Sequence, residues 1–234
     1  MLIAVTSIKS GGCTTFAAAL AAVWPAEPGL LVEADAAGGD LGGWHEVPDT
    51  PGLATLANAC RSGGTVDLDQ HVTRLPCGID VVVAAAGRPQ ASAAVGLLAD
   101  TEPARWAKER PTILDIGRLE PGSPALPLLE AADAVLVVTR GDVLSLKRVV
   151  DAELPTGRVQ LVLVGEPAYR PEEIVATVGL PVAVQLPWDR HSAEVIAGAR
   201  RARRAWKRVG MPATTRTLAL TLAKTPDPQG RDRR

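Results

Sequence analysis

The chain has 234 residues, of which 47% are hydrophobic and only 3% are aromatic. This length suits a single α/β domain, whose core must be built from Ala, Val and Leu. No apolar run reaches the roughly 18 residues needed to cross a bilayer. The three cysteines, Cys13, Cys60 and Cys77, show no metal-ligand spacing and follow no signal peptide, so we expect free thiols in a cytoplasmic protein.

The net charge of −1 conceals a strong asymmetry along the chain. Residues 1–197 hold 14 basic and 24 acidic side chains, whereas residues 198–234 hold 11 basic and 2 acidic ones. An acidic body of charge −10 therefore carries a basic end of charge +9. Such an end favours phosphate-rich partners, although a solvated helix face followed by a disordered tail would give the same count.

Short apolar runs alternate with Ala-rich or amphipathic stretches, which predicts repeated strand–helix units and a mostly parallel sheet of about seven or eight strands. The predicted strands are Leu2–Ser7, Leu30–Ala34, Ile79–Ala84, Thr112–Asp115, Ala134–Thr139, Gln160–Val164 and Val182–Gln185. The predicted helices are Thr15–Val23, Ala91–Leu98, Val143–Ala152, Glu172–Val178 and Ala193–Val209. Residues 38–75 are expected to form a loop with short helices. One domain is predicted over residues 1–224, followed by a disordered basic tail, 225–234.

The most informative local pattern is the turn between the first strand and the first helix. It reads Lys9-Ser10-Gly11-Gly12-Cys13-Thr14-Thr15. Small residues in such a turn let backbone N–H groups point at phosphate oxygens, and the following helix adds the positive end of its dipole. The general lysine motif of phosphate-binding loops is not matched, so spacing alone leaves an ordinary structural turn open.

This turn and its flanks resemble the ParA/MinD family of deviant Walker A ATPases, which carry K-G-G-x-G-K-T-T after a strand ending Val-Thr-Ser. Val5-Thr6-Ser7-Ile8-Lys9 matches the start of that pattern, and Leu20 follows Thr14 by the six residues that the family's helix requires. Lys9 then matches the signature lysine and Thr15 the magnesium-binding threonine. Thr14 stands where the family has its second lysine, and Cys13 stands at a glycine position.

Further motifs extend the resemblance over nearly the full chain. They are Glu33-Ala34-Asp35 with the following Gly38-Gly39-Asp40-Leu41, then Ile113-Leu114-Asp115-Ile116-Gly117, Ala132 to Thr139, and Leu186-Pro187-Trp188-Asp189. They are similar, in order, to the first switch, the second switch, the A-D-x-V-L-x-V-T strand and the I-P-x-D loop beside the base. The family's adenine-reading N-R dipeptide is replaced by Gly165-Glu166, and the D-x-P-x-G of the second switch is not preserved.

The resemblance implies a fold, a ligand and residue roles. The fold is a doubly wound P-loop NTPase domain, and the ligand is ATP with Mg²⁺. The predicted nucleotide-binding residues are Ser10, Gly11, Gly12, Cys13, Thr14, Thr15, Pro187, Trp188 and Asp189. Thr15 and Asp115 would hold the metal ion, Asp35 would orient the attacking water, and Lys9 would reach a partner's nucleotide across a homodimer.

Structural alternatives remain for these residues. Lys9 is also compatible with an exposed loop lysine, Asp35 and Asp115 with helix caps or loop carboxylates, and Trp188 with a packed rim side chain. Loss of a cation at Thr14 removes a charged hydrogen bond of roughly 1.5–3 kcal/mol, which corresponds to about ten- to a hundredfold in affinity. Hydrolysis is expected to be weak or absent, so the chain is at best a slow ATPase.

The predicted helix Ala193–Val209 has an apolar stripe at Val195, Ala199, Ala202, Trp206 and Val209. Its other faces carry the predicted surface-binding residues Arg200, Arg201, Arg203, Arg204, Lys207 and Arg208. This pattern predicts contact with non-specific DNA on the nucleoid or with the anionic inner face of the plasma membrane. A last packing helix with a solvated basic face is the alternative.

By resemblance, the chain is a nucleotide-dependent positioning or partitioning factor that acts as a dimer on a surface and carries an unknown cargo protein. Pilus assembly, chromosome partitioning and septum placement are the roles found in this family. The altered loop looks most like that of the pilus-assembly proteins TadZ and CpaE. Two other classes remain open: a pseudo-ATPase scaffold that does not use nucleotide, and a metabolic ATPase of related fold.

Overall fold

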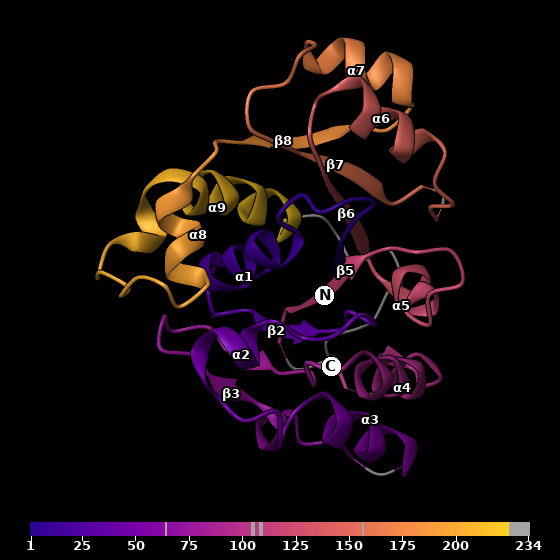
Figure 1. Cartoon of the computed structure of the whole chain (residues 1–234), viewed down its shortest axis with the longest axis vertical. Helices are drawn as coiled ribbons and strands as arrows, with labels where there is room; N and C mark the ends of the chain where they lie inside the picture. Colours follow the sequence, from indigo (N-terminus) through magenta and orange to yellow (C-terminus); the bar gives the residue numbers. More distant parts are fainter. Residues whose placement is uncertain (64, 104–105, 108–109, 156, 225–234) are drawn as a thin grey trace.

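An eight-stranded sheet runs through the molecule with helices on both faces (Figure 1). The computed structural model describes residues 1–63, 65–103, 106–107, 110–155 and 157–224. The strands are β1 (Leu2–Ser7), β2 (Leu30–Glu33), β3 (Thr73–Arg74), β4 (Asp80–Val82), β5 (Thr112–Arg118), β6 (Ala134–Thr139), β7 (Val159–Val164) and β8 (Val182–Leu186). Their order is β3-β4-β2-β5-β1-β6-β7-β8, and only β3 pairs antiparallel, with β4. The predicted doubly wound α/β fold is confirmed.

The helices form two layers with separate cores. One core packs strand residues such as Ile3 and Val5 against α1 (Cys13–Val23), α2 (Leu41–His45), α8 (Arg190–Ile196), the 3₁₀ turn η3 (Trp206–Arg208) and α9 (Gly210–Leu222). The other packs Leu2 and Ala4 against the 3₁₀ turn η1 (Leu68–His71) and the helices α3 (Leu53–Arg61), α4 (Arg88–Ala99), α5 (Leu126–Ala131), α6 (Val143–Val150) and α7 (Pro171–Val178). Alternate residues of β1 thus face opposite layers, which explains why its whole sequence is apolar or small.

Small side chains set how closely α1 approaches the sheet. Alanine is the commonest residue of this helix, and its residues from Phe16 to Val23 are all buried. At Gly29, just before β2, a Cβ atom would lie 2.7 Å from Cδ1 of Ile113 and 3.2 Å from Cα of Ala21. The carboxyl-terminal turn of α1 therefore packs directly against the start of β2 and against β5.

Among the described residues, the elements that the sequence did not lead us to expect are β3, α5 and α9. The expected helix Ala193–Val209 is wrong as a single element. Helix α8 ends at Ile196, and the chain continues through turns and bends to η3 before α9 begins at Gly210. The break lies at Gly198, which has a left-handed φ of 72° and leaves no room for a Cβ atom, since the carbonyl oxygen of Trp44 would lie 2.6 Å away.

The predicted tail, 225–234, lies outside the described residues. Within the part of the chain that the structure describes, no helix is long and apolar enough to cross a membrane.

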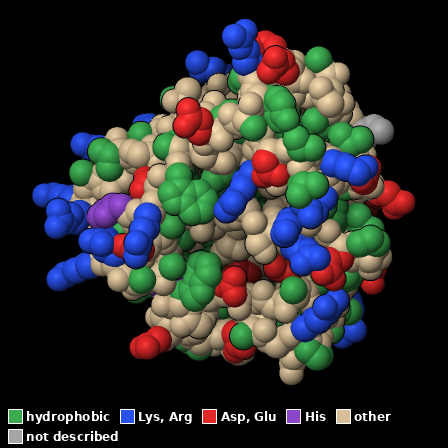
Figure 2. Space-filling model, turned by 45° about the horizontal axis from the view of Figure 1, so that its top comes forward, with side chains coloured by type: hydrophobic (Ala, Val, Ile, Leu, Met, Phe, Trp, Pro, Cys, Tyr) green, Lys and Arg blue, Asp and Glu red, His purple; other side chains and the backbone are tan. Residues whose placement is uncertain are grey.

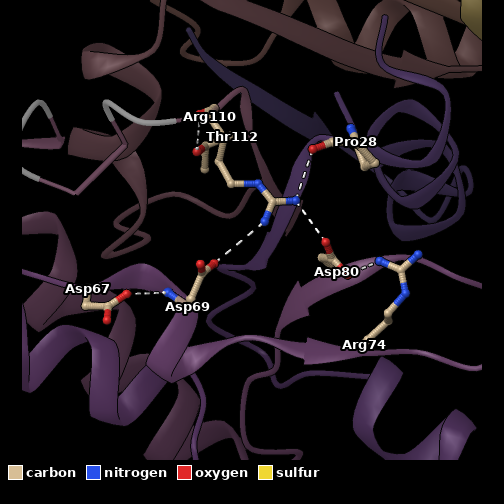
Figure 3. A network of polar contacts seen from close by, with 7 residues as sticks. All are labelled: Pro28, Asp67, Asp69, Arg74, Asp80, Arg110 and Thr112. Carbon is tan, nitrogen blue, oxygen red and sulfur yellow. Dashed lines mark hydrogen bonds and ion pairs between the residues drawn. The ribbon is translucent and has the colours of Figure 1, made fainter. Parts of the chain in front are cut away.

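A polar network around Arg110 joins the amino ends of β2, β4 and β5 to the carboxyl end of β3 (Figure 3). Its guanidinium donates to Asp80 and to the carbonyl oxygen of Pro28, both at 3.0 Å, and lies 3.9 Å from Asp69. Arg74 of β3 contacts the same Asp80 carboxylate at 2.6 Å. These contacts fix the edge strand β3 and the segment leading into β5, at the end of the sheet opposite the candidate site.

Candidate nucleotide site

The predicted loop residues and Asp35 lie where β1 and β2 end, beside Asp115 in the middle of β5. In the sheet, Val5 of β1 and Glu33 of β2 are both in register with Asp115 of β5. The loop 8–12 therefore leaves β1 beside the segments that follow β2 and β5. Open parallel sheets bind ligands at this edge, because the strand order reverses there and loops diverge to opposite layers.

The loop between β1 and α1 has the backbone shape of an anion cradle. Gly12 adopts a left-handed conformation, with φ of 86°, and its carbonyl accepts the first α-helical hydrogen bond from the N–H of Phe16 at 2.9 Å. A Cβ atom at Gly11 would lie 3.3 Å from the carbonyl oxygen of Val138 in β6. Lys9, Ser10 and Gly12 are exposed. A left-handed residue just before a helix is typical of loops whose N–H groups bind anions, and this loop lies at the positive end of an 11-residue helix.

Cys13 and Asp115 form a buried pair under this loop. The thiol donates a hydrogen bond to Oδ1 of Asp115 at 3.2 Å, and the N–H of Gly117 donates to the same oxygen at 3.1 Å. Burial raises the pKa of Asp115 to about 6, while hydrogen bonds from Thr14, Cys13 and Gly117 oppose that rise. Burial and the neighbouring Asp115 carboxylate raise the pKa of the Cys13 thiol. Cys13 thus supports the loop from below rather than lining its exposed surface.

Asp35 lies beside Gly117 and close enough to Asp115 that, after burial, its charge also raises the pKa of Asp115. Its Oδ1 accepts from the N–H of Ala37 at 2.7 Å, and burial raises its pKa. Its carboxylate also fills the space beside Gly117, whose left-handed φ of 66° leaves no room for a side chain. Two carboxylates of raised pKa therefore converge near the loop.

Glu33 is a feature of this edge to which the sequence analysis gave no role. It is almost completely buried, yet its Oε1 accepts from the N–H groups of Asp40 and Leu41 at 2.9 Å, and its Oε2 accepts from that of Ala84 at 3.0 Å. Glu33 therefore fastens the segment 38–41 to the end of β4. A glutamate within the apolar run of β2 was the available signal.

The loop after β8 places its three predicted residues differently. Trp188 is 69% exposed, and its ring lies 5.4 Å from the Arg140 guanidinium. The Asp189 carboxylate accepts from the N–H and hydroxyl of Ser192 and from the N–H of Met211 at 2.7–3.0 Å. Asp189 thus joins the start of α8 to the start of α9. Pro187 is exposed between β8 and this cap. The expected ligand contacts of all three stay predictions.

The basic residues expected on a helix lie instead on the segment between α8 and α9 and on η3. Figure 2 shows Lys and Arg side chains gathered at the left of the molecule, on the side of α8 in Figure 1. Arg200 pairs with Glu194 at 2.9 Å, and the Nζ of Lys207 donates to the carbonyl oxygen of Gly78 at 3.1 Å, so Lys207 points partly inward. Arg201, Arg203, Arg204 and Arg208 are exposed.

The residues present fit a magnesium nucleotide. Gly11 and Gly12 stand at positions where a side chain would crowd or strain the loop. Thr15 is half-buried in the first turn of α1, and the carboxylate of Asp115 lies near this turn. Hydroxyl and carboxylate oxygens are the ligands that Mg²⁺ prefers, with phosphates completing the set. Among the described residues, no group of three or more His, Cys, Asp or Glu side chains forms a metal site without such phosphates.

Comparison with solved structures identifies the fold. A ParA family ATPase from Chlorobium tepidum superposes with a TM-score of 0.72 at 20% identity, covering 94% of this chain and 98% of that one. The chain has the ParA/MinD ATPase fold. The cell division ATPase MinD of Pyrococcus furiosus gives a TM-score of 0.67 at 16% identity, covering 95% of this chain and 98% of its own.

Other proteins of the ParA/MinD fold were solved with nucleotide. The septum site-determining protein MinD of Pyrococcus horikoshii, complexed with Mg-ADP, matches with a TM-score of 0.63 at 15% identity, over 96% of this chain and 97% of that one. A variant of Cyanothece McdA in complex with ATP matches with a TM-score of 0.63 at 14% identity, over 94% and 96%. No family model and no curated protein sequence matches the chain.

Proposed function

We propose that the chain is a member of the ParA/MinD family that binds ATP and Mg²⁺, turns ATP over slowly or not at all, and positions a cargo as a homodimer on an anionic surface. In this proposal Ser10 to Thr15 hold the phosphates, and Thr15 and Asp115 hold the metal ion. We further propose a localising role like that of the pilus-assembly branch, because the altered loop favours binding over rapid turnover.

The observation that carries this proposal is the loop Lys9–Thr15 at the carboxyl end of the central strand β1. The left-handed Gly12 and the start of α1 behind it support phosphate binding, and the buried Asp115 beside them supports a metal ion. None of these features needs the lysine that Thr14 replaces. The charge lost at Thr14 lowers affinity, and it removes stabilisation from the transferring phosphoryl group during hydrolysis.

A scaffold that does not use nucleotide is the second candidate, and a specific observation favours it. The Cys13 thiol already occupies Oδ1 of Asp115, at 3.2 Å, and helix α6 exposes Val143, Leu144 and Val150 to more than half of their full extent. A site with its carboxylate engaged beside an exposed apolar helix suits a protein that docks partners. Nucleotide binding decides between the two candidates.

Calorimetric titration with ATP tests the proposal. We expect the native protein to bind Mg-ATP with a dissociation constant in the micromolar to millimolar range, roughly −8 to −4 kcal/mol. Thr14→Lys restores the missing charge and is expected to tighten binding by about ten- to a hundredfold. Thr15→Ala is expected to remove the dependence on magnesium. If millimolar ATP binds neither to the native protein nor to Thr14→Lys, the proposal is wrong and the scaffold function stands.

A further inference from the structure

A hollow of about 290 Å³ lies beside the loop Lys9–Thr15, between the start of this loop and the start of α6. Lys9, Ser10 and Gly11 line it from the loop, and Arg140, Asp142 and Arg148 line it from the end of β6 and from α6. Its volume lies at the lower limit of small-molecule pockets, so it suits a phosphate chain better than a whole nucleotide.

Three cations face this hollow without a matching anion. Within the described part of the chain, no carboxylate forms an ion pair with Lys9, Arg140 or Arg148. Arg148 donates one hydrogen bond, from Nη1 to the carbonyl oxygen of Leu144 at 3.2 Å, and its other N–H groups stay available. Like charges gathered around one cavity repel one another until an anion enters.

Asp142, the one acidic residue that lines the hollow, is engaged elsewhere. Its Oδ1 accepts from the N–H of Ser145 at 3.0 Å and its Oδ2 from the Ser145 hydroxyl at 2.8 Å, so it caps α6. The two hydrogen bonds from Ser145 are the main cause that lowers the pKa of the Asp142 carboxyl, and the positive charge of Arg140 adds to it. One capping carboxylate leaves the hollow with a net positive charge of two.

Arg140 connects the hollow to the loop after β8. Arg140 is exposed and directly follows β6, the strand that pairs with β1. Two residues earlier, the carbonyl oxygen of Val138 lies close to Gly11 of the loop between β1 and α1. The guanidinium of Arg140 lies over the exposed ring of Trp188 at 5.4 Å. Stacking on an aromatic face leaves the in-plane N–H groups of a guanidinium free to bind an oxyanion in a bidentate manner.

We propose that Arg140 and Arg148 bind the phosphate chain of a nucleotide in this hollow and supply the positive charge that Thr14 lacks. The inference rests on the proposed function, because it assigns two further residues to the same ligand. A guanidinium binds phosphate through two parallel hydrogen bonds, so two arginines offset one missing ammonium.

The test is titration of Mg-ATP and of tripolyphosphate into the native protein, Arg140→Ala/Arg148→Ala, the charge-keeping Arg140→Lys/Arg148→Lys, and Arg61→Ala. Arg61 is an exposed arginine on α3, near the other edge of the sheet, and serves as the control. We expect the double alanine variant to bind ATP at least about tenfold more weakly than the native protein, and the control to stay within about twofold. The lysine variant should lie between the two, because lysine keeps the charge but not the bidentate geometry. Trp188 fluorescence should change on ATP binding and lose that change in Trp188→Phe.

The outcomes separate the inference from the proposed function. If the native protein binds ATP and the double alanine variant binds it equally well, the inference is overturned and the proposed function stands. If the native protein binds neither ATP nor tripolyphosphate, both fall. Titration at several protein concentrations distinguishes whose nucleotide the arginines bind. If the double alanine variant loses ATP affinity at every concentration, they bind the nucleotide of their own subunit. If it loses affinity only at concentrations where dimers form, they bind the partner's nucleotide.

Discussion

At the scale of single residues, the sequence predicted that the loop Lys9–Thr15 would lie near the carboxylates of Asp35 and Asp115. Each follows or ends a predicted strand, and the carboxyl ends of parallel strands share one edge of the sheet. Lys9, Asp35 and Asp115 accordingly lie at the same edge. The role of Glu33 was not predictable, since its three partners come from two segments whose approach depends on tertiary structure. Likewise, nothing in the spacing of Cys13 indicated that its side chain would turn inward to Asp115.

Glu33 is expected to control the stability of the site's edge. Glu33→Ala would leave the N–H groups of Asp40, Leu41 and Ala84 without their acceptor, at about 1–3 kcal/mol each. We expect the free energy of unfolding to fall by about 3 kcal/mol or more in urea titrations. A neighbouring exposed carboxylate, as in Glu46→Ala, is the control and should change stability by less than about 0.5 kcal/mol. Equal stability of the two variants would contradict the role of Glu33.

The same residue predicts a dependence on pH. Burial raises the pKa of Glu33 from 4.5 to about 7, against the opposing effect of its backbone hydrogen bonds. The folded protein therefore holds the proton more tightly than the unfolded chain, so this group's contribution to stability falls as pH rises from about 4.5 to about 7, by about 3 kcal/mol. Glu33→Gln cannot ionise and should lack that fall. Parallel stability curves for the native protein and Glu33→Gln would show that the pKa is not raised.

At the scale of elements, the predicted strands and most helices were confirmed because continuous apolar runs and Ala-rich helices are local signals. The helix Ala193–Val209 failed for a physical reason: its stripe of apolar residues has helical spacing, but Gly198 takes a conformation that a helix cannot contain. Trp206 is nevertheless buried, so this part of the apolar stripe packs as expected. The arginines between α8 and η3 lie on an irregular segment.

That irregular segment is expected to carry surface binding. Replacing Arg200, Arg201, Arg203 and Arg204 with alanine removes four exposed positive charges, of which only Arg200 has an ion-pair partner among the described residues. We expect the variant to lose association with DNA or anionic vesicles at low salt and to lose its salt dependence. Sedimentation with vesicles and fluorescence anisotropy with DNA measure the two surfaces separately. Failure of the native protein to bind either one would restrict this segment to a structural role.

At the scale of the whole molecule, the layer arrangement was predictable because alternating strand and helix patterns allow few topologies. The likeness to solved structures extends over more than nine-tenths of the chain although identity does not exceed 20% in the comparisons above. The chain therefore shares the fold although its loop carries Cys13 and Thr14 where the sequence resemblance expects a glycine and a lysine.

Dimerisation is the property of the whole molecule that tests the proposed role of Lys9. Lys9 is exposed at the edge of the loop, beside the hollow and outside any ion pair of the described residues, so its ammonium is free to reach a second subunit. In a symmetric dimer that brings the two loop edges face to face, each Lys9 would contact the partner's phosphates.

Lys9→Ala should then leave a folded monomer with native thermal stability. Light scattering should show an increase in mass with Mg-ATP for the native protein and little or none for Lys9→Ala, with Lys147→Ala, on the exposed face of α6, as the charge-matched control. A dimer that forms equally without nucleotide, or that persists in Lys9→Ala, would show that the lysine does not act across the interface.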